Sequence, residues 1–192
     1  MLIMFLLFDI IELPERVSMD EMEADMQFYG RERELEILEQ TNHTDQFECT
    51  VLYGRRRIGK TLLLRKFMED KDALYFMALQ TGEKMNLECL SEVFNQYNKD
   101  SSGRLYPSFS SVFDELTRLA KNRRFVFVID EFPYLAENYP VISSLLQKYI
   151  DHEWKETRLH LILCGSSMSF MEKQILGAKS PLYGRRISQI KF

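Results

Sequence analysis

The sequence has few cysteines, and the spacing of those present does not indicate a pair. Cys49, Cys89 and Cys164 are the three cysteines of the chain, and long stretches separate them. An odd number at such spacings excludes a disulfide framework and the paired spacing of a structural zinc site. We therefore expect a reduced, cytoplasmic setting in which each cysteine is a small apolar core residue.

The sequence also lacks an excess of basic residues. Its 25 lysines and arginines are outnumbered by 29 acidic residues, so that the formal net charge is −4. This balance argues against a broad surface that coats nucleic acid, and direct nucleic-acid binding is not supported, although a local basic patch is compatible with it. Apolar residues make up 45% of the 192 positions, which predicts one globular domain with its own core.

No apolar run is long enough to span a bilayer. The segment MLIMFLLFDII at residues 1–11 has eight apolar residues before Asp9, whereas a spanning helix needs about 20. It also lacks the basic start and the cleavage site of a secretory signal. Residues 1–25 carry a net charge of −6, so we expect an acidic and apolar extension, followed by one domain at residues 26–192. We interpret the extension as loosely packed or as an artefact of start-site choice, and alternatively as a membrane or partner anchor.

The rest of the chain alternates apolar runs with amphipathic stretches. The apolar runs predict strands at residues 48–53, 73–79, 125–130, 158–164 and 187–192. The stretches between them predict helices at residues 31–40, 60–69, 84–98, 109–121 and 141–156. Near-continuous apolar strands that alternate with helices predict a parallel sheet covered on both faces, which is a three-layer α/β domain. We expect ligands at the carboxyl ends of its strands.

A glycine-rich loop follows the first of these strands. Residues 54–61 read GRRRIGKT, which matches G-x-x-x-x-G-K-[ST] between a predicted strand and a predicted helix. Gly54 and Gly59 allow the backbone to turn its N–H groups toward phosphate oxygens. The Lys60 ammonium can reach the β- and γ-phosphates of a nucleotide, and the Thr61 hydroxyl can ligate Mg²⁺. This loop is therefore the predicted nucleotide-binding segment.

The remaining residues of the segment are less informative. Ile58 and Leu62 belong to the predicted nucleotide-contacting stretch by position alone. Arg55, Arg56 and Arg57 either add phosphate contacts or point to solvent and pair with acids elsewhere. We favour the second interpretation, because the loop backbone already surrounds the phosphates.

Two carboxylates follow the third apolar run. FVFVIDEF at residues 125–132 ends a predicted strand in Asp130 and Glu131. Asp130 can hold the Mg²⁺ shell, usually through water, and Glu131 can orient or deprotonate the attacking water. An acidic strand end alone is a weak signal, because many strands end in acids at the surface. Its separation of 70 residues from Lys60, with one intervening strand, makes the combination strong.

Further polar residues flank the last two predicted strands. Ser166 and Ser167 follow the strand at 158–164, where a hydroxyl can bond the attacking water or the γ-phosphate; helix capping is an equal alternative. Arg185 and Arg186 precede the last strand and can neutralise charge that develops in phosphoryl transfer, in cis or from a neighbouring subunit. The alternative for the arginines is a solvated turn with a surface ion pair.

The chain resembles the archaeal-type P-loop ATPases, a group of AAA+/STAND-like additional-strand ATPases that also occurs in bacteria. The resemblance covers residues 26–192 and rests on six segments in order: FYGRERELEILEQ, VLYGRRRIGKTLLLRKF, TGEKMNLECLSEVF, FVFVIDEFPYL, LILCGSSMSFME and PLYGRR. It implies a P-loop NTPase core with a five-stranded parallel sheet of order 5-1-4-3-2, and ATP as the nucleotide.

The resemblance also implies roles for particular residues. Tyr29, Gly30 and Arg31 would lie on the adenine side of the pocket. One of the two serines would be the polar sensor beside the γ-phosphate, and one of the two arginines would be the arginine finger. Members of the family usually continue into a helical lid and a winged-helix region, whereas this chain stops at Phe192. We therefore expect a truncated core whose pocket is completed by a homo-oligomer or by a C-terminal partner.

Two functions follow from these residues. The first is Mg²⁺-dependent ATP hydrolysis, in which Lys60 and the loop amides stabilise charge while Glu131 activates water. The second is a nucleotide-gated module that binds ATP or ADP and turns over negligibly because the lid is missing. Glu131 favours the first, since a pure switch has less need of a base. A small-molecule kinase fits less well, because a kinase needs a second substrate pocket.

Overall fold

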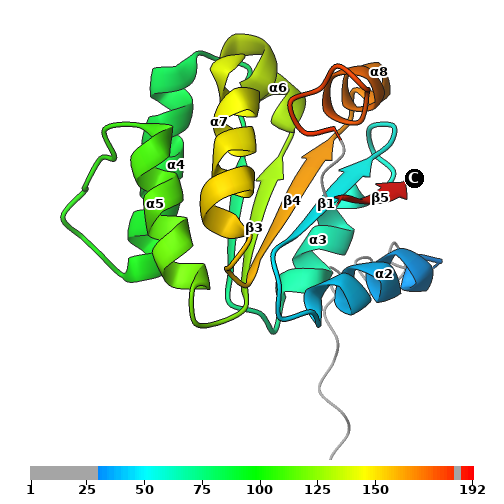
Figure 1. Ribbon diagram of the computed structural model, residues 1–192, viewed down its shortest axis with the longest axis horizontal. Coiled ribbons are helices and arrows are strands. Elements are labelled where there is room, and N and C mark those ends of the chain that lie inside the picture. Colours follow the sequence, from blue (N-terminus) through cyan, green and yellow to red (C-terminus); the bar gives the residue numbers. More distant parts are fainter. Residues whose placement is uncertain (1–29, 184–186) are drawn as a thin grey trace, which may run out of the picture.

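A five-stranded parallel sheet forms the centre of the chain. The computed structural model describes residues 30–183 and 187–192. Its strands are β1 (Glu48–Tyr53), β2 (Ala73–Met77), β3 (Phe125–Asp130), β4 (Leu159–Gly165) and β5 (Ile187–Lys191). Neighbouring strands pair in parallel in the order β2-β3-β4-β1-β5, which confirms the expected order 5-1-4-3-2. Figure 1 shows β3, β4, β1 and β5 side by side in this order.

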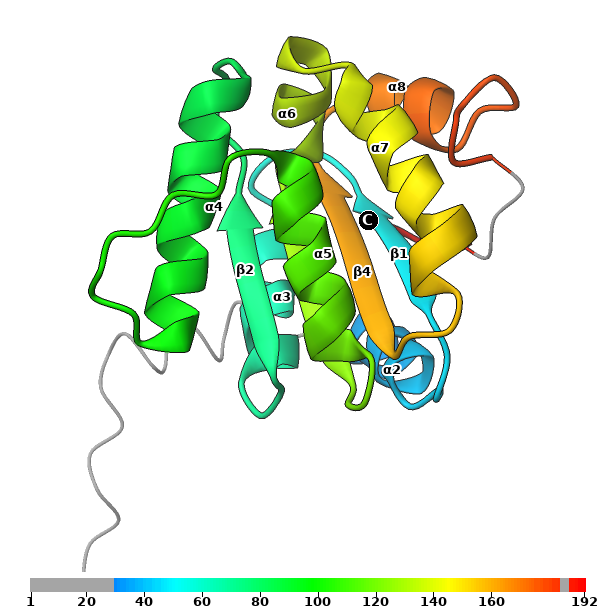
Figure 2. The same ribbon diagram turned by 60° about the vertical axis from the view of Figure 1, so that its left-hand side comes forward.

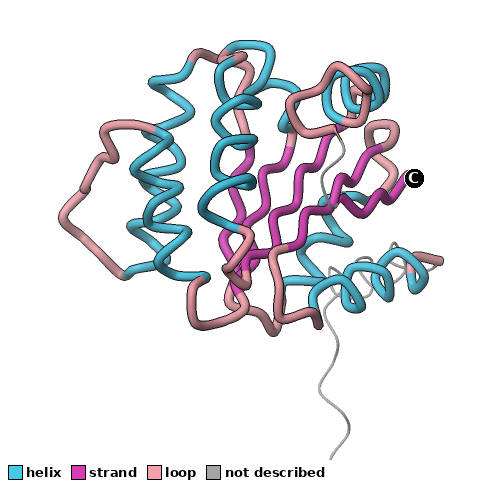
Figure 3. Tube along the Cα trace, in the orientation of Figure 1, coloured by secondary structure: helices cyan, strands magenta, loops and turns pink. Residues whose placement is uncertain are grey.

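Helices cover both faces of this sheet. One face packs against α2 (Glu32–Asn42) and α3 (Lys60–Met68). The opposite face packs against α4 (Glu83–Asn98), α5 (Phe109–Ala120), α6 (Phe132–Asn138), α7 (Val141–Tyr149) with its π-helical continuation η1 (Ile150–Trp154), and the short α8 (Met168–Phe170) with η2 (Met171–Ile175). Figure 2 shows the two helical layers, and Figure 3 the alternation of strand and helix along the chain. The predicted three-layer α/β architecture is confirmed.

The three central strands are buried on both faces. Every residue of β1, β3 and β4 is buried. On β3, Phe127 and Ile129 belong to the core beneath α4 to α7, whereas Val126 and Val128 belong to the core beneath α3. Successive side chains of a strand point to opposite faces, so both sets must be apolar. This double burial explains why the sequence shows these strands as near-continuous apolar runs, interrupted in β1 and β4 by a few buried polar residues.

Aromatic side chains fill the larger of the two cores. The ring of Trp154 lies 5.2 Å from that of Phe113 and 5.4 Å from that of Tyr149, between centroids. Its indole N–H donates to the Thr117 hydroxyl at 2.9 Å, which satisfies the polar edge of a fully buried ring. The expected helix at 141–156 is therefore present as α7 and η1, but its last turn is π-helical and ends at Trp154.

The sequence prediction missed two helical segments. Helix α6 begins directly after Glu131, and α8 begins directly after Ser167. Both segments are short, and Pro133 in the first turn of α6 makes the start of this helix hard to predict from the sequence. Proline is compatible with that position, because the first N–H groups of a helix have no partner within the helix. Strand β2 also ends earlier than expected, at Met77.

The extension predicted at residues 1–25 lies outside the described residues, so its boundary and role stay predictions. Within residues 30–183 and 187–192, none of the helices has both the length and the apolar character that crossing a membrane requires.

A buried polar cluster ties α2 to the amino ends of the strands. His160 on β4 is fully buried, and its Nε2 lies 2.9 Å from Thr50 Oγ1 while its Nδ1 lies 3.2 Å from Asn42 Oδ1. The Arg124 guanidinium donates to the carbonyl oxygen of Thr41 at 3.1 Å, within the last turn of α2. These bonds satisfy polar groups that the sheet buries, at the edge opposite the glycine-rich loop.

The buried imidazole makes the stability of the fold depend on pH. Burial, assisted by the charges of Arg124 and Lys71, lowers the pKa of His160 from 6.5 to about 3. Between those values the unfolded chain binds a proton that the folded chain does not, so the unfolding free energy falls as pH falls. We expect protonation of this group in the unfolded chain to lower the unfolding free energy by up to about 1.4 kcal/mol for each pH unit between about pH 6 and pH 4. Urea denaturation over this pH range is the measurement.

Variants isolate that contribution. His160→Gln carries no titrating ring, so its unfolding free energy should fall less steeply with pH than that of the parent chain. His152→Gln, which changes an exposed histidine, should keep the parent slope. Equal slopes for His160→Gln and the parent would show that the folded chain accepts the proton.

Candidate functional site

The glycine-rich loop connects the end of β1 to the start of α3 at the carboxyl edge of the sheet. Gly59 precedes the first residue of α3 and has a φ of 90°, a left-handed conformation that favours glycine. A Cβ atom on Gly54 would lie 2.6 Å from Phe192 Cβ and 2.8 Å from Ile58 Cδ1, so a larger residue does not fit there. The two glycines are therefore required for different reasons, one for its dihedral angles and one for close approach.

The ammonium group of Lys60 lies inside the curve of this loop. The residue is buried, and its Nζ donates to the carbonyl oxygens of Gly54 at 3.0 Å and Arg55 at 2.7 Å. A buried ammonium needs hydrogen-bond partners, but neither carbonyl carries a charge. These two bonds therefore leave the positive charge of Lys60 without an ionic partner, so that it can attract an anion at the loop.

Asp130 receives hydrogen bonds from three elements at the end of β3. Its Oδ2 accepts from the Thr61 hydroxyl on α3 at 3.0 Å and from the Tyr75 hydroxyl on β2 at 2.6 Å. Its Oδ1 accepts from the backbone N–H of Glu131 at 2.8 Å. Desolvation raises the pKa of Tyr75, and the hydrogen bond to Asp130 raises it further, so the phenol stays protonated. The structure thus brings together two predicted residues, Thr61 and Asp130, and adds Tyr75, which sequence reasoning missed.

Glu131 lies at the turn from β3 into α6. Its φ of 50° is left-handed, which is uncommon for a residue with a side chain. Its Oε2 accepts hydrogen bonds from the hydroxyl of Ser166 at 2.9 Å and from the backbone N–H of Ser166 at 3.4 Å. Ser167 occupies the position before α8, but its side chain makes no capping hydrogen bond. Of the two serines, Ser166 therefore contacts the second carboxylate.

The three loop arginines take different positions. Arg55 is exposed and does not line the cavity, whereas Arg56 and Arg57 do. The Arg56 guanidinium donates to the Ser166 hydroxyl at 3.3 Å and to the Tyr134 hydroxyl on α6. Its partners are hydroxyl groups on other elements. All three arginines are exposed, and whether they contact phosphate stays a prediction.

A cavity of about 420 Å³ opens between these groups. Its lining residues come from the loop, α3, the end of β3 and α6, and they are Arg56, Arg57, Gly59, Lys60, Thr61, Leu62, Asp130, Glu131 and Tyr134. Cationic groups on the loop side fit phosphate oxygens, and carboxylates on the strand side fit a cation. Among the described residues, His, Cys, Asp and Glu form no cluster of three that could hold a metal. The two carboxylates that line the cavity fit Mg²⁺, which proteins bind through one or two carboxylates together with water and phosphates.

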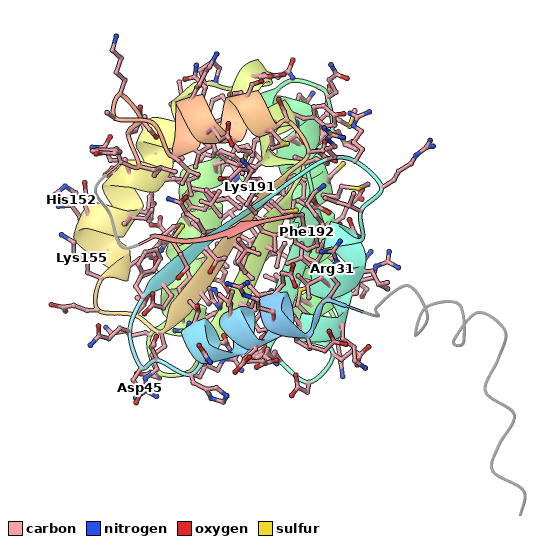
Figure 4. All side chains as sticks on the ribbon, turned by 90° about the vertical axis from the view of Figure 1, so that its right-hand side faces the viewer. Arg31, Asp45, His152, Lys155, Lys191 and Phe192 are labelled. Carbon is pink, nitrogen blue, oxygen red and sulfur yellow. The ribbon has the colours of Figure 1, made fainter. Side chains whose placement is uncertain are left out.

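Arg31 links the start of α2 to the outer side of the loop. Its Nη2 donates to the Ile58 carbonyl at 3.1 Å, and its guanidinium carbon lies 4.4 Å from the ring centroid of Phe192 (Figure 4). Gly30, just before it, has a φ of 85°. Phe192 is a second residue that sequence reasoning missed, because only the pairing of β5 with β1 brings it to the loop.

Three of the residues predicted for the site, namely Tyr29, Arg185 and Arg186, lie outside the described residues, so their roles stay predictions.

Comparison with known families identifies the domain. The model of an ATPase domain found predominantly in Archaea matches residues 28–191. The chain belongs to this family. An uncharacterized protein of Methanocaldococcus jannaschii is 34% identical to this ATPase domain over 167 residues, which are 85% of this chain and 35% of that protein. An uncharacterized ATP-binding protein of the same organism is 48% identical over 44 residues, 23% of this chain and 75% of that protein.

Solved structures share the fold of this ATPase domain. The Walker-type ATPase of Pyrococcus abyssi matches with a TM-score of 0.66 at 22% identity, over 91% of this chain and 55% of that one. Drosophila ORC bound to DNA matches with a TM-score of 0.61 at 14% identity, over 88% of this chain and 44% of that one. At these identities the likeness concerns the fold alone. Family and fold together make this chain an ATP-binding ATPase core. The chain spans about a third of the 34% identical Methanocaldococcus jannaschii protein and about half of these solved structures.

The end of β4 tolerates no side chain at Gly165, and this sets the position of Ser166. A Cβ atom on Gly165 would lie 2.7 Å from Pro133 Cδ and 3.0 Å from Met171 Sδ. We expect Gly165→Ala to lower the unfolding free energy by about 1–3 kcal/mol through overpacking, measured by urea denaturation. Gly82→Ala is the control, because a Cβ there meets nothing within 4 Å and its φ is −66°. A destabilisation of the same size at both positions would contradict the close approach.

Proposed function

We propose that this chain hydrolyses ATP in a Mg²⁺-dependent reaction, as an AAA+/STAND-like core with a Walker A motif at residues 54–61 and a Walker B motif at Asp130 and Glu131. The observation that carries the proposal is the 3.0 Å hydrogen bond between Thr61 and Asp130. It joins the two motifs, which lie far apart in the sequence, at one point of the cavity.

Phosphate binding is assigned to the loop and to the first turn of α3. Gly54 to Gly59 provide backbone N–H groups, and the amino end of α3 provides its positive partial charge. Lys60 supplies the formal charge, because its ammonium lies in the loop with carbonyl partners alone. The backbone at Thr61 and Leu62 extends this segment along the cavity wall.

Metal binding is assigned to Thr61 and Asp130. Bound Mg²⁺ would neutralise charge on the β- and γ-phosphates. The Thr61 oxygen offers a direct ligand, and the Asp130 carboxylate holds the ion's water shell from the strand end. Asp130 is 3% exposed and accepts three hydrogen bonds, so its orientation is already fixed before any ligand binds.

Water activation is assigned to Glu131. Glu131 lines the cavity, and its carboxylate accepts the hydrogen bond from the Ser166 hydroxyl. The Ser166 hydroxyl holds Glu131 in place and is our candidate for the polar sensor, with Ser167 as the alternative. Charge that develops on the γ-phosphate is met by Lys60 and, in this proposal, by Arg185 or Arg186 as an arginine finger from the same or a neighbouring subunit.

The base of the nucleotide and the partners belong to the same proposal. Arg31 contacts the loop backbone at Ile58, which supports an adenine site formed by Tyr29, Gly30 and Arg31. ATP and ADP are the proposed ligands, and a homo-oligomer or a C-terminal partner completes the pocket. The proposal includes a cytoplasmic location, which rests on cysteine use alone.

One observation favours a second function, a nucleotide-gated module with negligible turnover. The Glu131 carboxylate is engaged by both the hydroxyl and the N–H of Ser166. Both bonds end on Oε2, so a glutamate held in this way has fewer acceptor sites left for water. The two functions differ in turnover and not in binding.

Lys60→Ala tests the nucleotide site. Removal of the ammonium should weaken Mg·ATP binding by at least about 100-fold, because charge-assisted hydrogen bonds to phosphate are lost. The measurement is calorimetric titration of the purified chain. Lys66→Ala, on the exposed side of the same helix, should bind as the parent does. If Lys60→Ala binds Mg·ATP as the parent does, the loop is not the nucleotide site.

Glu131→Gln tests the assignment of the base. The amide keeps the size of the side chain and can still contact Ser166, so Mg·ATP binding should stay within about twofold while turnover falls by about 100-fold or more. Phosphate release under saturating ATP is the measurement, and Glu137→Gln on the exposed side of α6 is the control. If Glu131→Gln turns over like the parent, the base is another group. Binding without turnover in the parent would instead support the nucleotide-gated module.

A further inference from the structure

Tyr75 is a residue of the edge strand β2 whose hydroxyl reaches the neighbouring strand. In the parallel pairing of β2 with β3, Tyr75 lies opposite Val128, and Met77 lies opposite Asp130. Asp130 is therefore the diagonal neighbour of Tyr75, two residues farther along β3 and on the same face as Val128. A long aromatic side chain spans this diagonal.

The Tyr75 hydroxyl donates a hydrogen bond to the carboxylate that is assigned to metal binding. Tyr75 donates to Asp130 Oδ2 at 2.6 Å, and Thr61 donates to the same oxygen at 3.0 Å. Hydrogen bonds to a charged acceptor are shorter and about twice as strong as those between neutral groups. With the backbone N–H of Glu131 on Oδ1, these bonds fix both oxygens of the carboxylate.

We propose that Tyr75 is a positioning residue for metal binding: its hydroxyl orients the Asp130 carboxylate so that the carboxylate meets Mg²⁺ in the geometry that the nucleotide site needs. This inference rests on the proposed function, because it requires Asp130 to face the metal. Groups that hold a metal's ligands from outside typically change metal affinity by 10- to 100-fold when removed.

The ring and the hydroxyl of Tyr75 have separable tasks. The ring packs against the core beneath α3, which includes Leu63 and Phe67. The hydroxyl adds the bond to Asp130. Tyr75→Phe therefore keeps the packing and removes the positioning contact alone. Strand β2 forms one edge of the sheet, and through this hydroxyl it also contacts the candidate site.

The chain contains a matched control for this substitution. The hydroxyl of Tyr97 donates to Asp72 at 2.6 Å, at the opposite end of β2, and also accepts from Arg123. Tyr97→Phe removes a tyrosine–aspartate hydrogen bond of the same length, far from the glycine-rich loop. Both substitutions should lower the unfolding temperature, so a loss of stability alone does not separate them.

Calorimetric titration of ATP over a series of free Mg²⁺ concentrations, and in EDTA, tests the inference. Tyr75→Phe should raise the Mg²⁺ concentration at which ATP affinity is half-enhanced by about tenfold, with ATP affinity in EDTA equal to that of the parent. Tyr97→Phe should match the parent at every Mg²⁺ concentration.

The contrary results are distinct. Parent-like Mg²⁺ dependence in Tyr75→Phe would overturn the inference and leave the proposed function standing. The same loss of affinity with and without Mg²⁺ would also overturn it, because the role of the hydroxyl would then be structural. ATP affinity that does not depend on Mg²⁺ in the parent would overturn the metal assignment of Asp130, and with it both proposals.

Discussion

The carboxylate of Asp130 is the group on which the candidate site depends. It stands at the carboxyl end of β3, between β2 and β4, and it accepts hydrogen bonds from Thr61, from Tyr75 and from the backbone of Glu131. Thr61 and Tyr75 lie on α3 and β2, so their two contacts exist only while these elements keep their places beside β3. The third bond is local, because Glu131 directly follows Asp130. A buried carboxylate is costly unless it is paired in this way. The same bonds therefore compensate its burial and fix its direction.

The sheet supports backbone conformations that short peptides avoid. Arg57, Gly59 and Glu131 all have positive φ, at 62°, 90° and 50°. For a residue with a side chain this conformation costs on the order of 1 kcal/mol, and it persists where the surroundings hold it. Gly59 lies directly before α3 and Glu131 directly after β3, whereas Arg57 lies within the loop that connects the fully buried strand β1 to α3. The rigid interior thus holds a strained edge, and that edge contains the polar chemistry.

The sequence predicts the parts of this arrangement that are local. Strands β1 and β3 are found at their expected residues because burial on both faces requires a largely apolar sequence, and the loop at 54–61 is found because its glycines specify its turn. Contacts between strands have no such local signal. Tyr75 is one aromatic residue in an apolar run, and its bond to Asp130 depends on β2 lying beside β3. The bond from Arg56 to Tyr134 depends on α6, a helix that the sequence prediction missed.

Hydrogen–deuterium exchange of the full chain, with and without Mg·ATP, tests the central claim most directly. The claim is that one ligand joins the loop after β1 to the ends of β3 and β4. It predicts slower amide exchange on Mg·ATP addition at residues 54–61, at 130–131 and at 165–167, with little change along α4 and α5. Unchanged exchange in these three segments at saturating Mg·ATP, or protection confined to other parts of the chain, would contradict it.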